Sequence, residues 1–278
     1  MQRISDVVRD AGPHFRSDWN HCRHRTLVPV ERAILAYQAV LRVDKLGIPG
    51  AIVEAGVWKG GMSCLMARAH LRAAARIDRT SWLFDTFDGM PAPDPQHDGI
   101  KAVQQYKEAV NGTSQGFGCR VEAGKWCLGR YSEVEDLMKT QSPNMQLRLV
   151  QGKVEDTLGG GPSELPEQIA VLRLDTDWFE STKIELDVLW PRLSPGGWLY
   201  IDDYYDFAGC RRAVHEWAMQ HNYSTSVGFG RDGRHNVRVF HLFKSNPFEG
   251  QRAPFVTRNP LMFNDTDSQP MLVAPRRR

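Results

Sequence analysis

The chain has 278 residues, 41% hydrophobic and 24% charged, which suits one large globular domain or a domain with extensions. Its 35 basic and 33 acidic residues leave a net charge of +2, too balanced for the concentrated basic surface that nucleic-acid binding requires. The five cysteines lack CxxC spacing, the N-terminus lacks a signal-peptide core, and no apolar run approaches the ~20 residues that span a bilayer. We therefore expect a cytoplasmic protein that binds neither nucleic acid nor a membrane.

The first fifty residues predict a helical segment ahead of the main domain. Apolar side chains at Val30, Ile34, Tyr37 and Leu41 recur near helical spacing, and a GIPG turn closes the segment. We expect residues 1–50 to form an N-terminal helical extension or lid.

Apolar strands and helices then alternate, which predicts a mostly parallel sheet with helices on both faces. We assign this α/β domain to residues 51–245. The expected strands are 51–57, 81–87, 147–154, 169–175 and 196–203, and the expected helices are 62–75, 132–139, 181–193 and 210–221. Towards its end, "STSVGFG" and "NVRVFHLFK" around an RDGR turn predict a C-terminal hairpin that adds an antiparallel strand.

Two segments interrupt this alternation. Residues 92–129 are rich in Gly, Pro, Asp and His, and they predict an insertion that serves as a lid, with a disordered segment or an oligomer contact as the alternative. Residues 246–278 contain five prolines and predict an extended tail on the domain or on a neighbouring subunit. We therefore expect a homo-oligomer.

The turn after the first expected strand reads "AIVEAGVWKGGMS" and places an acid before a run of glycines. It lacks the GxGxxG spacing of a dinucleotide fold, and Met62 stands where a P-loop needs its lysine. A cationic ligand without phosphate fits better, and S-adenosylmethionine carries an α-ammonium and a sulfonium. Glu54 would orient its amino-acid end, directly or through water, while the glycines let the backbone come close.

A second acid supports this interpretation. Asp85 ends the next expected strand in "LFDTFDG", where a carboxylate can accept both hydroxyls of a ribose. Further along, Gln151, Glu155 and Asp156 are expected on the adenine side of the same ligand.

Four aspartates are expected at the ligand-binding edge of the sheet. "LRLDTDWFEST" places Asp175 and Asp177 at the end of one strand, and "LYIDDYYD" places two more at the end of the next. Like charges gathered there repel one another unless a cation intervenes, and oxygen ligands favour a hard ion, Mg²⁺ first, with Mn²⁺ or Ca²⁺ as alternatives. We predict that Asp175, Asp202 and Asp203 form a metal site. Asp177 is expected to cap the helix that follows.

The motifs "VEAGVWKGG", "FDTFDGMP", "LRLDTDWFEST" and "LSPGGWLYIDDY" resemble the macrocin O-methyltransferase family. Its members are bacterial enzymes dependent on S-adenosylmethionine and Mg²⁺ that methylate sugar hydroxyls of antibiotics and other natural products. The resemblance runs from about Thr26 to Lys244, and it implies the Rossmann-like fold of class I S-adenosylmethionine-dependent methyltransferases, with a seven-stranded sheet. Thr176 and Phe179 stand where family members often have Gly and Tyr.

The resemblance and the motifs together assign a donor site and a metal site. The expected donor-site residues are Glu54, Ala55, Gly56, Trp58, Gly60, Gly61, Ser63, Asp85, Thr86, Gln151 and Asp156. The implied metal ligands are Asp175, Asp202 and Asp203.

The expected reaction is an in-line transfer of a methyl group from a sulfonium to an acceptor hydroxyl, in which positioning of the two reactants supplies much of the rate. Sugar hydroxyls are very weak acids, so a base is needed. We expect Asp175 to be the base, although a ligated carboxylate is a poor one, with His97 as the alternative. The expected acceptor is a small-molecule glycoside. The alternatives are a non-sugar vicinal-diol or phenolic acceptor, an NAD-dependent oxidoreductase, and a metal-stabilised binding module without catalysis.

Overall fold

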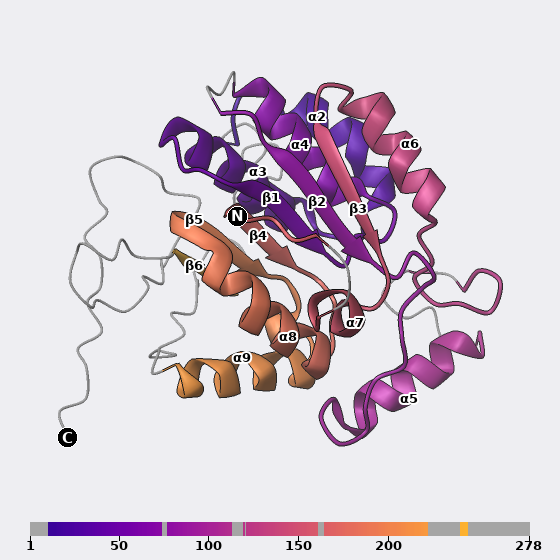
Figure 1. The fold of residues 1–278 in the computed structure, drawn as a ribbon. Helices are drawn as coiled ribbons and strands as arrows, with labels where there is room; N and C mark the ends of the chain where they lie inside the picture. The colour runs from indigo at the N-terminus through magenta and orange to yellow at the C-terminus, as the bar shows by residue number, and fades with distance from the viewer. Residues whose placement is uncertain are drawn as a thin grey trace, which may run out of the picture.

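The computed structural model describes residues 11–73, 77–112, 119, 121–160, 164–221 and 240–243. Within them the sheet has the strand order β3-β2-β1-β4-β5-β6 (Figure 1). The strands are β1 Ala51–Ala55, β2 Thr80–Asp85, β3 Gln146–Gln151, β4 Ile169–Leu174, β5 Leu193–Ile201 and β6 Phe240–Phe243. The first five are parallel, and β6 is antiparallel to β5.

The five predicted parallel strands are confirmed, and their places in the sheet explain which of them are most apolar. Every residue of β1 and β4 is buried, because these central strands are covered on both faces. The antiparallel β6 falls within the predicted second strand of the hairpin. The first strand of that hairpin and the turn lie outside the described residues, so the seven-stranded sheet stays a prediction.

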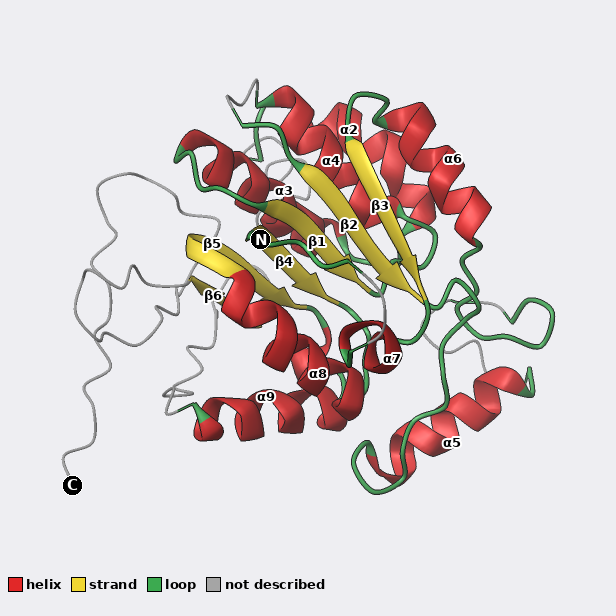
Figure 2. Cartoon of the chain, in the orientation of Figure 1, coloured by secondary structure: helices red, strands yellow, loops and turns green. Residues whose placement is uncertain are grey.

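Helices cover both faces of the sheet (Figure 2). On one side lie α2 Phe15–Cys22, α3 Val30–Lys45, α4 Gly61–Arg72 and α6 Tyr131–Gln141. On the other lie α7 Val154–Leu158, α8 Phe179–Leu189 and α9 Ala208–Gln220, and short 3₁₀ turns occur at η1 Arg23–Arg25, η3 Trp190–Arg192 and η4 Asp203–Tyr205. Because α2 and α3 share a hydrophobic cluster with α4 and the sheet, the N-terminal segment is packed onto the domain. No helix in the described ranges is both long and apolar enough to cross a membrane.

The segment 92–129 contains a helix, α5 Gly99–Val110, that its composition did not predict. Ala102 and Ala109 are its buried residues, and Tyr106 and Val110 pack partly against the core. The helix lies at the periphery of the molecule in Figure 1, and the chain before it is held to the domain by a hydrogen bond of 2.9 Å from Trp178 Nε1 to the carbonyl of Pro91. The segment is rich in Gly, Pro and Asp before the helix, and its apolar stripe is short, so its composition predicts a loop.

Candidate active site

A cavity of about 390 Å³ opens at the carboxyl ends of the parallel strands. The strand order reverses between β1 and β4, and ligands of open α/β sheets bind at such a reversal. Residues from the glycine turn, from the ends of β2, β4 and β5, and from the N-terminal segment around Thr26 line this cavity. The size is typical of a small-molecule site.

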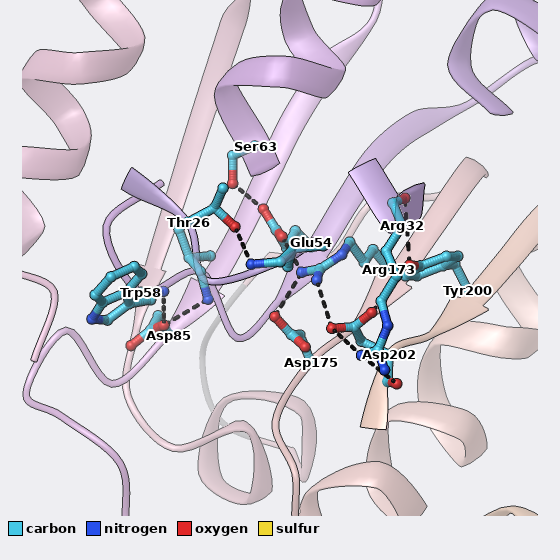
Figure 3. Close-up of polar contacts among 12 residues, drawn as sticks. Thr26, Arg32, Glu54, Trp58, Ser63, Asp85, Arg173, Asp175, Tyr200 and Asp202 are labelled. Carbon is cyan, nitrogen blue, oxygen red and sulfur yellow. Dashed lines mark hydrogen bonds and ion pairs between the residues drawn. The ribbon is translucent and has the colours of Figure 1, made fainter. Parts of the chain in front are cut away.

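Glu54 and Arg173 form a buried ion pair beneath the cavity. They are direct neighbours in the register of β1 and β4, both are 1% exposed, and Glu54 Oε1 lies 2.5 Å from Arg173 Nη1. The other oxygen of Glu54 accepts a hydrogen bond from the Ser63 hydroxyl (Figure 3). Burial raises the pKa of Glu54, and Arg173 opposes this rise. Both oxygens of Glu54 are thus occupied by the protein itself.

Arg173 connects this pair to the aspartates at the strand ends. Its Nη1 lies 2.8 Å from Asp175 Oδ2, and its Nη2 lies 3.3 Å from Asp202 Oδ2 (Figure 3). Burial opposes its charge, but the surrounding carboxylates outweigh burial and hold the pKa of Arg173 well above its ordinary value. We did not predict this residue, although an arginine inside the apolar strand "IAVLRLD" is a visible signal, since a buried charge requires partners.

Asp175, Asp202 and Asp203 converge as predicted, with one oxygen of each within 4.8 Å of the others. Burial raises the pKa values of Asp175 and Asp203 well above the ordinary range. Burial also acts to raise the pKa of Asp202, but Arg173 and Arg32 outweigh it and lower that pKa. Asp203 Oδ2 is buried and has no hydrogen-bond partner among the described residues. A convergent set of oxygens with one unpartnered member fits a hard divalent cation.

The expected helix cap by Asp177 is wrong. The N-cap of α8 is Trp178, and the N–H of Phe179 donates 2.8 Å to the carboxylate of Asp98, which precedes α5. Asp177 has φ = 68°, a left-handed conformation, and it lines the cavity. The turn after β4 therefore presents two carboxylates to the cavity, from Asp175 and Asp177.

Asp85 fixes the shape of the glycine turn. Its Oδ2 accepts hydrogen bonds from the backbone N–H groups of Val57 (2.7 Å) and Trp58 (2.9 Å), and its Oδ1 accepts one from Phe87 (2.8 Å). Burial raises the pKa of Asp85, and these three donors oppose the rise. The carboxylate lines the cavity beside Thr86, so it holds the turn and faces a ligand at once.

Gly56 lies where the turn meets β4. Its φ is +82°, and a Cβ atom on it would overlap the carbonyl oxygen of Asp175. Asp175 in turn donates its N–H to the carbonyl of Ala55 at 2.8 Å. The missing side chain thus allows the turn and the first aspartate to approach each other.

We expect Gly56→Ala to lower the free energy of unfolding by about 2–5 kcal/mol, the sum of left-handed strain and overpacking. Gly99→Ala is the matched control, because Gly99 has φ = +84° but no heavy atom within 4 Å of its added Cβ. It should show the strain alone, about 1–2 kcal/mol. Urea unfolding measures both, and equal losses would contradict the close approach.

The family model described as macrocin-O-methyltransferase (TylF) matches residues 8–228. The chain belongs to the macrocin-O-methyltransferase family. It is therefore an O-methyltransferase that uses S-adenosylmethionine, and the alternatives of an NAD-dependent oxidoreductase and of a binding module without catalysis are wrong.

Two curated relatives are O-methyltransferases. The chain is 36% identical over 225 residues, 81% of its length and 79% of the relative's, to a Streptomyces olivaceus 4'-O-methyltransferase of 8-demethyl-8-(2,3-dimethoxy-alpha-L-rhamnosyl)-tetracenomycin-C. It is 36% identical over 205 residues, 73% of each chain, to the mycinamicin III 3''-O-methyltransferase of Micromonospora griseorubida. Among solved structures, the O-methyltransferase NovP has a TM-score of 0.59 at 28% identity, covering 80% of this chain and 83% of its own.

Most of the residues predicted from the macrocin-O-methyltransferase motifs line the cavity. These are Glu54, Gly56, Trp58, Asp85, Thr86, Asp175, Asp202 and Asp203. The remaining predicted donor-site residues are not in its lining, namely Ala55, Gly60, Gly61, Ser63, Gln151 and Asp156. Ser63 contacts the site through Glu54. Of the three residues expected on the adenine side, Glu155 lines the cavity, together with residues 152–154, whereas Gln151 and Asp156 do not.

His97 and the N-terminal segment lie in places that the sequence did not predict. His97, the alternative base, is not in the cavity lining; its ring stacks on Phe179 at 4.5 Å, and its Nδ1 lies 2.5 Å from Asp94. Conversely, the N-terminal segment contributes residues 25–29 and Arg32 to the lining. The helical periodicity of that segment shows where it is buried, but it does not show which turn reaches the site.

Proposed function

We propose that the chain transfers the methyl group of S-adenosylmethionine to a hydroxyl of a sugar in a natural-product glycoside, with Mg²⁺ at the carboxylate cluster. One observation carries the proposal: the acid-flanked glycine turn and the cluster of three aspartates open into the same cavity. The methyl donor and the acceptor can therefore bind next to each other in one cavity. The relatives that act on a rhamnosyl tetracenomycin and on mycinamicin support a glycoside as the acceptor class.

The donor half of the site is the glycine turn with Asp85, Thr86 and residues 152–155. Asp85, which already holds the turn, accepts the ribose hydroxyls on its cavity side. Arg173 favours the charged form of Glu54, and because the same guanidinium also faces Asp175 and Asp202, carboxyl groups outnumber it at the floor of the site, which suits a ligand with an ammonium and a sulfonium. Its own oxygens contact Arg173 and Ser63, so it acts on the ammonium through the field or through water.

The acceptor half is the carboxylate cluster. A divalent cation held by Asp175, Asp202 and Asp203 would serve as a Lewis acid that lowers the pKa of the acceptor hydroxyl. The side chain of Asp175 is 24% exposed, whereas Asp202 and Asp203 are buried, so Asp175 is the most open of the three to the cavity. We assign Asp175 as the proton acceptor. As the hydroxyl loses its proton, the oxygen bonds to the methyl carbon, the carbon–sulfur bond breaks, and S-adenosylhomocysteine is released.

The test is methyl transfer from S-adenosylmethionine labelled in its methyl group to a panel of glycosides, their aglycones and a catechol. We expect label in the glycosides, loss of transfer in excess chelator, and recovery with Mg²⁺. Transfer to the catechol or to the aglycones alone would replace the sugar with a phenolic acceptor. Full transfer in chelator would remove the metal from the proposal.

We expect Asp85→Asn to weaken binding of S-adenosylhomocysteine by at least about tenfold, or 1.4 kcal/mol. The substitution removes the charge. Both oxygens of Asp85 accept hydrogen bonds from backbone N–H groups, so the NH₂ group of the amide must face one of these donors. Calorimetry in chelator measures the product's affinity, and Mn²⁺ affinity should be unchanged. Asp88→Asn, in the same loop and paired with Lys125, is the control that should leave both affinities intact. Equal product binding by the two variants would remove Asp85 from the donor site.

The division of the chain and its assembly also remain our proposals. We propose an N-terminal helical extension over residues 1–50, a methyltransferase domain over 51–245 with a lid at 92–129, and a Pro-rich tail from 246. We further propose a cytoplasmic homo-oligomer. Light scattering of the full chain, and of a chain ending at residue 245, tests the assembly and the tail together.

A further inference from the structure

Arg32 joins the N-terminal helix α3 to the loop that carries two of the three clustered aspartates. Its side chain is 15% exposed and lines the cavity. Nη1 lies 3.3 Å from Asp202 Oδ2 and donates to the Asp202 carbonyl oxygen at 3.4 Å, while Nη2 donates to Asp206 Oδ2 at 2.8 Å. One guanidinium thus contacts both ends of the loop, whose η4 turn begins at Asp203.

The contacts of Asp202 show what this arrangement fixes. Asp202 Oδ1 accepts a hydrogen bond from the Tyr200 hydroxyl at 3.0 Å, and Oδ2 lies between Arg32 and Arg173 at 3.3 Å from each (Figure 3). Arg173 lies on β4 and Tyr200 on β5, both in the sheet. Arg32 is the contact that comes from another layer, and it also holds Asp206, beyond the turn. The planar fork of an arginine can set the direction of two carboxylates at once, which a lysine cannot.

We propose that Arg32 is a positioning residue for the metal site: from α3, it holds the 202–206 loop so that Asp202 and Asp203 face Asp175. This inference rests on the metal of the proposed function. It assigns the N-terminal segment a part in forming the acceptor half of the site, although none of its residues is among the clustered carboxylates. It also gives a reason for the ion pair between Arg32 and Asp206 in the cavity lining.

The direction in which metal affinity changes when Arg32 is removed distinguishes a positioning role from an effect of its charge alone. A guanidinium close to a dication repels it, so a purely electrostatic Arg32 would weaken metal binding, and its removal would strengthen it. A positioning Arg32 predicts the opposite, because the loop loses its orientation when the fork is removed. Arg32→Met removes the charge and the fork, and Arg32→Lys keeps the charge but loses the fork.

The experiment is titration of the full chain with Mn²⁺, counting free ion by electron paramagnetic resonance, after removal of metal with chelator. We expect Arg32→Met to weaken Mn²⁺ binding at least tenfold and Arg32→Lys to recover less than a third of that loss. Binding of S-adenosylhomocysteine in chelator should stay within threefold of wild type in both variants, which shows that the donor half is folded. In turnover assays with excess Mg²⁺, part of the lost activity should return.

Arg68→Met is the matched control. Arg68 is 14% exposed and also joins the N-terminal segment to the domain, through Asp18 at 2.9 Å, but it lies outside the cavity lining. It should lower the melting temperature and leave Mn²⁺ affinity unchanged. Unchanged or tighter Mn²⁺ binding by Arg32→Met overturns the inference and leaves the proposed function intact, as does equal weakening by Arg68→Met. A wild-type chain that binds no Mn²⁺ overturns the metal and this inference together, while product binding in chelator still tests the donor site.

Discussion

Asp175→Asn is expected to lower kcat by roughly 10³-fold, within the range of about 10²–10⁴ that a positioned proton acceptor contributes. The amide keeps the volume of the side chain but cannot take a proton from the acceptor hydroxyl. It also removes the charge of one of the three proposed oxygen ligands, so metal affinity should fall. The initial rate of label transfer to the best glycoside, at saturating Mg²⁺, measures the effect.

Two measurements make this result specific. Product binding in chelator should change less than threefold, because the donor half of the site contacts Asp175 mainly through its backbone near Gly56. Asp187→Asn removes an aspartate that pairs with Lys183 on α8, outside the cavity lining, and it should leave kcat within twofold of wild type. A kcat for Asp175→Asn within tenfold of wild type would mean that another group takes the proton.

The fold could be predicted from the sequence because its elements depend on local patterns. Apolar runs that alternate with helices predict parallel strands, and five were found where they were expected. The convergence of Asp175, Asp202 and Asp203 follows from the same rule, because the carboxyl ends of neighbouring parallel strands meet at one edge. That prediction needs only the adjacency of β4 and β5, and the positions of the other strands do not affect it.

The parts that were missed depend on contacts between distant segments. Arg173 pairs with Glu54 because of the register of β1 and β4, and no spacing in the sequence contains that register. Arg32 reaches its loop because α3 packs beside the sheet, a contact across about 170 positions that periodicity does not specify. Asp177 failed as a cap because the chain turns left-handed there, and Asp98 from a separate segment took the role.

Arg173→Met is the prediction with the largest expected effect on stability. Arg173 is fully buried among Glu54, Asp175 and Asp202, and its loss leaves carboxylates in a low-dielectric interior without their shared cation. Breaking a buried ion pair by removing one partner costs about 3–5 kcal/mol. For a chain of this size we therefore expect the melting temperature to fall by about 6–20 °C.

The pH dependence of this loss identifies its cause. Burial raises the pKa of Glu54 from its ordinary value of 4.5, and Arg173 limits the rise. A carboxyl whose pKa is raised by folding stabilises the folded state where it is protonated, and that stability is lost as the pH increases through the folded pKa. Without Arg173 the pKa of Glu54 rises further, so the destabilisation should be smaller at pH 5 than at pH 8.

Glu54→Gln in the Arg173→Met background supplies the decisive comparison. The glutamine cannot ionise, so it removes the unpaired buried charge while keeping the shape and the contact with Ser63. The double variant should regain part of the lost melting temperature at pH 8 and little at pH 5, a coupling that a double-mutant cycle measures directly. If the two substitutions instead add at both pH values, Arg173 stabilises the chain by packing alone, and the charge of Glu54 must be balanced by another group.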